Sequence, residues 1–231
     1  MSKKVFLSVG HGGIDPGAVG NGFKEKDLNL SIATACMSFL FDNGVNVQMS
    51  RYKDENDSLP EAIKECNAFN PDLAIDIHNN AGGGDGAEVY YYSGGGTSKT
   101  LADNILSEIV SIGQNSRGAK TRVENGKDYY GFIRMTKPPA VIVECAFIDN
   151  ATDIQIIDTD AEQKAMGIAI AKGILKTLGI EYKTEEKEPE KTNILYKVQI
   201  GAFSIKSNAE NCLENVKKAG FEDAFIVKVN K

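Results

Sequence analysis

Three short apolar runs of the chain each lead into a residue that can bind a metal ion or carry a proton. These runs are residues 5–9, 73–77 and 140–143. The first reaches His11 through a glycine turn, the second reaches His78, and the third reaches Glu144. In open α/β sheets ligands bind beyond the carboxyl ends of the strands, so these three side chains can converge on one site. The chain has two histidines and both occupy such a position, which favours a shared metal ion over two unrelated structural roles.

Glu25 follows the glycine-rich loop after His11 and completes a set of two histidines and one carboxylate with His11 and His78. Such a set is a known form of catalytic zinc site, in which the fourth position is left for water. The bound water becomes nucleophilic near neutral pH, and a second carboxylate, here Glu144, can take its proton and hand it to a leaving amine. A structural role stays open for each residue taken singly. A lone histidine at a strand end is more often a hydrogen-bonded structural residue, and the helix dipole alone favours a carboxylate at Glu25.

The composition indicates a water-soluble globular protein and argues against several classes of partner. The chain has 231 residues, a formal net charge of -6 and a pI near 5.1, with no block rich in lysine and arginine. We therefore expect neither nucleic-acid binding nor membrane insertion. The apolar run near the N-terminus is too short for a secretory leader, so we expect the protein to be made in the cytoplasm. The four cysteines are far apart in sequence, which is typical of buried free thiols.

Strand and helix patterns alternate along the first 180 residues. Strands are expected at residues 45–49 and 87–92, and helices from Glu25 to the Asn43-Gly44 stop, from Ser58 to about residue 69, at 98–112 and at 161–178. Residues 113–128 have no clear period and are expected to form a functional or mobile loop. This alternation predicts an α/β fold, with a mostly parallel sheet and helices on both faces.

A charged segment separates this region from a short C-terminal one. We predict a catalytic domain over residues 1–180, a charged linker over 181–192 and a small unit over 193–231. In the last unit the pattern predicts a strand at 195–200, a helix at about 208–219 and a strand at 224–229, which is one βαβ unit.

Four ordered motifs, spread over about residues 3–180, resemble the zinc-dependent N-acetylmuramoyl-L-alanine amidases of the amidase_3 type. They are Gly10-His11-Gly12-Gly13 with Asp15-Pro16-Gly17-Ala18, Glu25-Lys26 before Leu28-Asn29-Leu30, Ile77-His78-Asn79-Asn80, and Pro139 to Glu144 with Phe147-Ile148-Asp149-Asn150. The resemblance implies that His11, Glu25 and His78 bind Zn²⁺ and that Glu144 is the catalytic glutamate. Two positions depart from the family pattern: Asp76 stands where serine is frequent, and Ala146 where glycine is usual.

The same resemblance implies hydrolysis of the amide between N-acetylmuramic acid and L-alanine in bacterial peptidoglycan. The expected absence of an export signal resembles phage or prophage endolysins, which act on the wall after holin-type release or lysis, and also mother-cell lytic enzymes of sporulating bacteria. Two other classes of function stay open. They are a zinc peptidase that cuts within the stem peptide and a non-catalytic module that binds the cell wall.

The C-terminal segment resembles the first half of a SPOR-type peptidoglycan-binding domain, on the motif from Tyr196 to Phe203 followed by Ala209 and Leu213. A strand of a generic small unit is the alternative reading. About 36 residues are too few to bury a core of their own, and neither a disulfide nor a metal is signalled there. We therefore expect this segment to form a homodimer by interleaving two copies, as well as to bind the wall.

Overall fold

The chain divides into two units, residues 1–184 and residues 185–231. A six-stranded sheet forms the centre of the first unit. The computed structural model describes residues 2–182 and 199–229. In spatial order the strands are β4 (Asn46–Met49), β1 (Lys4–Val9), β5 (Leu73–Asn80), β10 (Ala140–Phe147), β6 (Ala87–Tyr91) and β7 (Ser116–Lys120). The first four strands run parallel, and β6 and β7 run opposite to them. The predicted mostly parallel sheet is therefore confirmed, with a reversed pair at one side.

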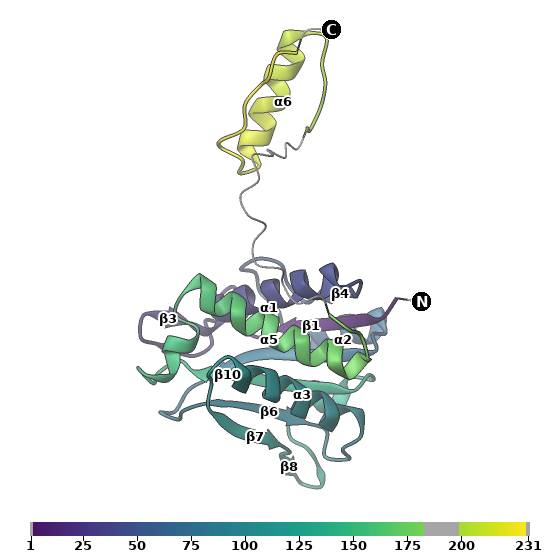
Figure 1. Ribbon diagram of the computed structural model, residues 1–231, viewed down its shortest axis with the longest axis vertical. Helices are drawn as coiled ribbons and strands as arrows, with labels where there is room; N and C mark the ends of the chain where they lie inside the picture. The colour runs from purple at the N-terminus through teal and green to yellow at the C-terminus, as the bar shows by residue number, and fades with distance from the viewer. Residues whose placement is uncertain (1, 183–198, 230–231) are drawn as a thin grey trace. The chain divides into compact units, whose positions relative to one another are not determined.

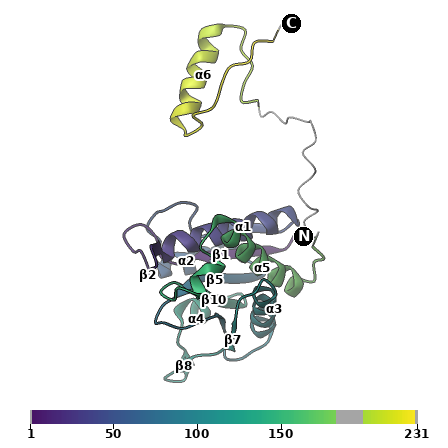
Figure 2. The ribbon, with the colours of Figure 1, turned by 60° about the vertical axis from the view of Figure 1, so that its left-hand side comes forward.

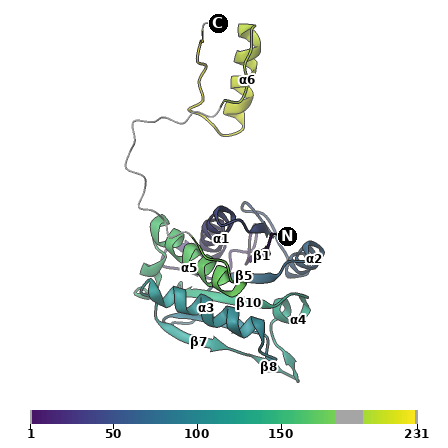
Figure 3. The same cartoon turned by 45° about the vertical axis from the view of Figure 1, so that its right-hand side comes forward.

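Helices cover both faces of this sheet, as predicted (Figure 1). One face carries α1 (Glu25–Asp42), α3 (Thr97–Ser111) and α5 (Asp160–Leu178), and the other carries α2 (Leu59–Phe69) and the short α4 (Gly131–Met135). Figure 3 shows α3 and α5 on one side of the strands and α2 and α4 on the other. Helix α5 packs between α1 and α3, and its N-cap residue Thr159 forms a capping box with Glu162.

The two faces differ in how much apolar surface they bury. Side chains alternate between faces along a strand, so Val5, Leu7 and Val9 of β1 join the larger core under α1, α3 and α5. Phe6 joins a smaller cluster under α2 and α4, together with Ala74 and Ile142. The smaller cluster ends before the carboxyl ends of the strands. Polar side chains follow it there, on the same face.

His78 and Glu144 lie within strands rather than after them. Strands β5 and β10 run to Asn80 and Phe147, beyond the apolar runs of the sequence, and pair His78 directly with Glu144. Residues paired in parallel strands point to the same face of the sheet. The pairing therefore places the two side chains next to each other.

The predicted loop over residues 113–128 is wrong in part. It contains β7, the last strand of the sheet, and a hairpin of β8 (Val123–Glu124) and β9 (Lys127–Asp128), which projects beyond β7 (Figure 2). Strand β7 has the sequence Ser-Arg-Gly-Ala-Lys and no buried residue, because it lies at the polar edge of the sheet. It therefore lacks the apolar period that identifies a strand.

The remaining short elements are β2 (Val19–Gly20), β3 (Phe23–Lys24) and a 3₁₀ turn at Asp153–Ile156.

The second unit contains the predicted helix, α6 (Lys206–Lys218). Residues 224–229, predicted as a strand, form no strand, because a strand needs a hydrogen-bonded neighbour and the described part of this unit offers none. Most of the other predicted strand, residues 195–198, and nearly all of the predicted linker lie outside the described residues.

Tyr182 packs against the ring of Phe39 in α1, so the first unit extends at least to residue 182. None of the helices in the described ranges is long and apolar enough to cross a membrane.

Candidate active site

His11, Glu25 and His78 converge at the carboxyl ends of β1 and β5. Glu25 lies between the two histidines: its Oε2 is 3.2 Å from His11 Nε2 and its Oε1 is 2.9 Å from His78 Nδ1. The ligand atoms of the three residues all lie within 4.8 Å of one another. Two imidazole nitrogens and one carboxylate in this arrangement match the donor set of a catalytic zinc site. The structure thus brings together the three residues that the sequence predicted as metal ligands.

The loop after β1 needs glycine at two positions for these residues to approach. A Cβ atom on Gly10 would lie 2.2 Å from Cε1 of His78, so only glycine leaves room for that ring. Gly17 has a φ of +64°, and a Cβ there would lie 2.5 Å from Oε2 of Glu25. His11 itself adopts a left-handed φ of 63°. The glycine-rich loop therefore allows these side chains to approach one another closely.

Arg51 anchors this loop by hydrogen bonds to backbone carbonyl oxygens. Its side chain is 1% exposed, and its guanidinium donates to the carbonyl oxygens of Val9, Gly10 and Lys26, at 3.2, 3.3 and 2.7 Å, and of Lys53 at 3.2 Å. The first three acceptors belong to the end of β1, to the loop and to the first turn of α1, and Lys53 follows β4. One buried side chain therefore fixes the segments that carry His11 and Glu25.

Each histidine has a second carboxylate near its outer nitrogen, the ring nitrogen that does not face Glu25. Asp15 Oδ2 lies 2.8 Å from His11 Nδ1, and Asp76 Oδ2 lies 3.4 Å from His78 Nε2. Neither the contact of Asp15 with His11 nor that of Asp76 with His78 was among the sequence predictions. The alternation of side chains along a strand could have identified Asp76, because it stands two residues before His78 and so shares its face. Asp15 lies in an irregular loop, and no periodic signal could have identified its contact with His11.

Glu25 is held in the ionised form by its neighbours. Burial alone would raise the pKa of Glu25, but hydrogen bonds with His11 and His78 outweigh it and keep the pKa well below its ordinary value. The backbone N–H groups of Ala18 and Asn79 also donate to this carboxylate, at 2.9 and 3.1 Å. An ionised, fixed carboxylate suits a metal ligand.

Glu144 lies beside this group with a different electrostatic character. Burial raises its pKa to about 7; Glu25, Glu88 and Asp76 add to the increase, and His78 opposes it. A carboxyl group that titrates near neutral pH is suited to take up and return a proton. The structure therefore places all four predicted site residues together.

A cavity of about 280 Å³ opens onto the site. Its lining includes His11, His78 and Glu144, while Glu25 lies 4% exposed behind them. The other acidic lining residues are Asp15, Asp57 and Asp76, and the apolar part of the wall is formed by Leu59, Ala62, Tyr130, Phe132 and Ile142. No lysine or arginine is among the described residues that line it. The cavity combines an acidic side with an apolar wall from α2 and α4.

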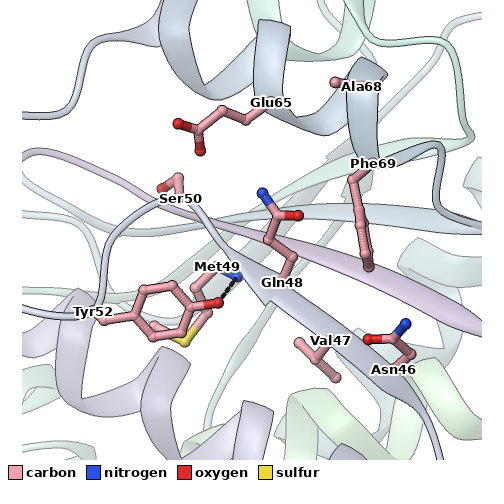
Figure 4. Close-up of a pocket in the computed structure, with 9 residues that line it drawn as sticks. All are labelled: Asn46, Val47, Gln48, Met49, Ser50, Tyr52, Glu65, Ala68 and Phe69. Atoms are coloured by element: carbon pink, nitrogen blue, oxygen red, sulfur yellow. Dashed lines mark hydrogen bonds between the residues drawn. The ribbon is translucent and has the colours of Figure 1, made fainter.

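A larger cavity, of about 750 Å³, lies beside the edge strand β4 and contains none of these four residues (Figure 4). Side chains of β4 form one side, and Glu65, Ala68 and Phe69 of α2 lie across from them. The hydroxyl of Tyr52 accepts a hydrogen bond from the backbone N–H of Met49 at 3.1 Å. Its size does not make it a candidate active site, because it lacks the grouped ligands and the proton-transfer residue.

Comparisons with known proteins agree with this geometry. Residues 5–176 match the Amidase_3 family, described as N-acetylmuramoyl-L-alanine amidase, and residues 171–228 match the SPOR domain. The chain is 34% identical over 229 residues to the sporulation-specific N-acetylmuramoyl-L-alanine amidase of Bacillus subtilis (strain 168), which covers 97% of this chain and 85% of that protein. It is 32% identical over 223 residues to the endolysin of Bacillus phage SPP1, covering 95% and 82% respectively.

A solved structure gives the same result for the first unit. The N-acetylmuramoyl-L-alanine amidase AmiC2 of Nostoc punctiforme is similar with a TM-score of 0.70 and 29% sequence identity, over 77% of this chain and 97% of that one. The SPOR match begins inside α5, whose residues Ala171, Ile174 and Leu175 are buried in the core of the first unit. Since the first family match spans most of the sequence and includes the whole candidate site, the chain belongs to the Amidase_3 family of N-acetylmuramoyl-L-alanine amidases, with a SPOR domain match towards its C-terminus.

Proposed function

We propose that this protein is a zinc-dependent amidase that hydrolyses the bond between N-acetylmuramic acid and L-alanine in bacterial peptidoglycan. His11, Glu25 and His78 would hold the zinc ion, and Glu144 would be the general base and acid. The observation that carries the proposal is the convergence of three metal-type donors within 4.8 Å, next to a carboxyl group whose pKa is raised to about 7. The donor set fits zinc by its chemistry.

The residues of the site divide the work of such a reaction. When bound, zinc supplies a nucleophilic water near neutral pH and polarises the carbonyl oxygen of the substrate. Glu144 takes a proton on its carboxylate and returns it to the nitrogen of the leaving L-alanine. Leu59, Phe132 and Ile142 form an apolar wall on one side of the cavity. Glu25 would stay ionised as a ligand, and the backbone N–H groups of Ala18 and Asn79 donate hydrogen bonds to its carboxylate.

Product analysis of digested sacculi tests the bond that is cut. We expect the purified protein with added zinc to release new N-terminal L-alanine together with muramic acid residues that carry a free lactyl carboxyl group. New amino ends from any other residue of the stem peptide would instead identify the zinc peptidase that the sequence left open. Wall binding without any new ends would identify a non-catalytic module.

We further propose a phage or prophage endolysin role for the chain. Similarity to the endolysin of phage SPP1 over 95% of this chain supports it. Similarity of the same extent to a sporulation-specific amidase supports the alternative, a mother-cell lytic enzyme. In both roles the enzyme would be made in the cytoplasm and reach the wall on release or lysis.

The C-terminal unit, proposed here as residues 193–231 after a charged linker at 181–192, would bind the wall and form a homodimer. The SPOR match supports wall binding. Residues 199–229 bury no side chain, and α6 has no buried residue. The large apolar side chains exposed there are Ile200, Phe203, Ile205, Phe221, Phe225, Ile226, Val227 and Val229. This range carries four lysines and four acidic residues, a net charge of zero, so two copies do not repel each other.

Light scattering tests the dimer. We expect the full chain to have the mass of a dimer and a chain ending at Thr184, where the first unit ends, to be a monomer. Val227→Asp in the full chain is expected to give a monomer as well, because it puts a charge into the apolar segment, while Lys228→Glu beside it is the matched control. A monomeric full chain, or a dimer that survives truncation, would overturn the proposal.

A further inference from the structure

Asp76 is a buried carboxylate that the proposed reaction does not use. It is 4% exposed and stands in the middle of β5, between Ser8 of β1 and Ile142 of β10. Its Oδ1 atom is buried and has no hydrogen-bond partner. Burying a carboxylate without its full set of partners costs free energy, so its presence calls for an explanation.

The explanation lies in its other oxygen atom. Asp76 Oδ2 lies 3.4 Å from His78 Nε2, whereas His78 Nδ1 lies 2.9 Å from Glu25. The two nitrogens therefore face different carboxylates: Nδ1 faces the proposed metal ligands and Nε2 faces Asp76. A neutral imidazole has one N–H group. If Nδ1 binds the metal, the proton must be on Nε2, opposite the carboxylate of Asp76.

We propose that Asp76 is a positioning residue that fixes the tautomer and orientation of His78, so that Nδ1 is presented to the metal. This inference rests on the zinc centre of the proposed function. Carboxylates on the outer nitrogen of a metal-binding histidine orient the ring and raise its basicity, and their loss typically weakens metal binding about 10–100-fold.

The two outer carboxylates of the site should contribute unequally. Asp15 makes the shorter contact, 2.8 Å to His11, but its side chain is 62% exposed. The side chain of Asp76 is 6% exposed. Solvent and salt weaken an exposed charge contact much more than a buried one. Asp76 is therefore the more important of the two, although its distance is longer.

Zinc titration of the full-length protein against a competing chelator tests the inference. We expect Asp76→Asn to bind zinc about 10–100-fold more weakly than the unchanged protein. Asp57→Asn is the matched control, because Asp57 lines the same cavity as Asp76 but contacts neither histidine. An equal loss in Asp57→Asn would mean that only the overall charge of the cavity matters, and unchanged affinity in Asp76→Asn would show that the contact is not used. Either result overturns the inference.

Two further measurements separate positioning from a structural role. Zinc is expected to raise the melting temperature of Asp76→Asn less than that of the unchanged protein, because the variant binds the metal more weakly. Equal stabilisation of the two proteins by zinc would overturn the inference. In nitrogen NMR of the zinc-loaded protein, which has two histidines, His78 should carry its proton on Nε2. If the unchanged protein takes up no zinc, the proposed function itself fails.

Discussion

Glu144→Gln is expected to lower the hydrolysis of peptidoglycan at least about 100-fold while zinc stays bound, since general acid–base groups contribute about 10²–10⁴-fold. Glutamine has nearly the size of glutamate but cannot take up the proton. Glu144 supplies none of the three grouped ligand atoms, so its replacement leaves the proposed metal site intact. Initial rates on purified sacculi, together with metal analysis of the same sample, measure both properties.

Glu65→Gln is the matched control for this substitution. Glu65 is also a glutamate beside a cavity, but it lies near β4, away from the grouped histidines. Its replacement should leave turnover unchanged. A Glu144→Gln protein with near-normal turnover would show that another group moves the proton, and one that lost its zinc would place Glu144 among the ligands.

His78→Ala is expected to remove both the zinc and the activity. Loss of the metal removes several kcal/mol of charge stabilisation, which corresponds to roughly 10³-fold or more in rate. His11→Ala should behave in the same way, because both rings contact Glu25. Metal content, measured with the rate on sacculi, tests the expectation, and melting temperature confirms that the variants are folded.

A chelator provides an independent test of the same point. Removing the metal from the unchanged protein should abolish activity, and adding zinc should restore it. Zinc added to His78→Ala should restore nothing. Full zinc occupancy in that variant would overturn the ligand assignment, whatever its activity.

The sequence predicted the centre of the fold and the grouping of the site for the same reason. Buried parallel strands appear as continuous apolar runs, and ligands of such sheets gather at the ends of these strands. The sequence alone therefore predicts that His11, His78 and Glu144 lie together. Their exact depth was not predictable, because polar residues interrupt the apolar pattern of both strands: β5 continues through His78 to Asn80, and β10 continues past Glu144.

Features set by tertiary context were missed. Strand β7 is polar because it lies at an edge, so its sequence does not differ from that of a loop. Residues 224–229 have the composition of a strand but no neighbour to pair with among the described residues. The anchoring of the His11 loop by Arg51 depends on backbone carbonyls at residues 9–10, 26 and 53, three separate segments that no spacing in the sequence can reveal.

Because Arg51 anchors the His11 loop, the proposed metal site does not need a metal ion to order it. In many small zinc proteins the metal itself orders the chain, so the apoprotein is unfolded. Here a guanidinium that belongs to the chain holds the loop of His11 and the start of α1, so folding would fix the proposed ligands before any metal ion binds. If the protein is the proposed zinc enzyme, we therefore expect its metal-free form to be folded but inactive. Zinc would then complete the proposed site without a change of fold.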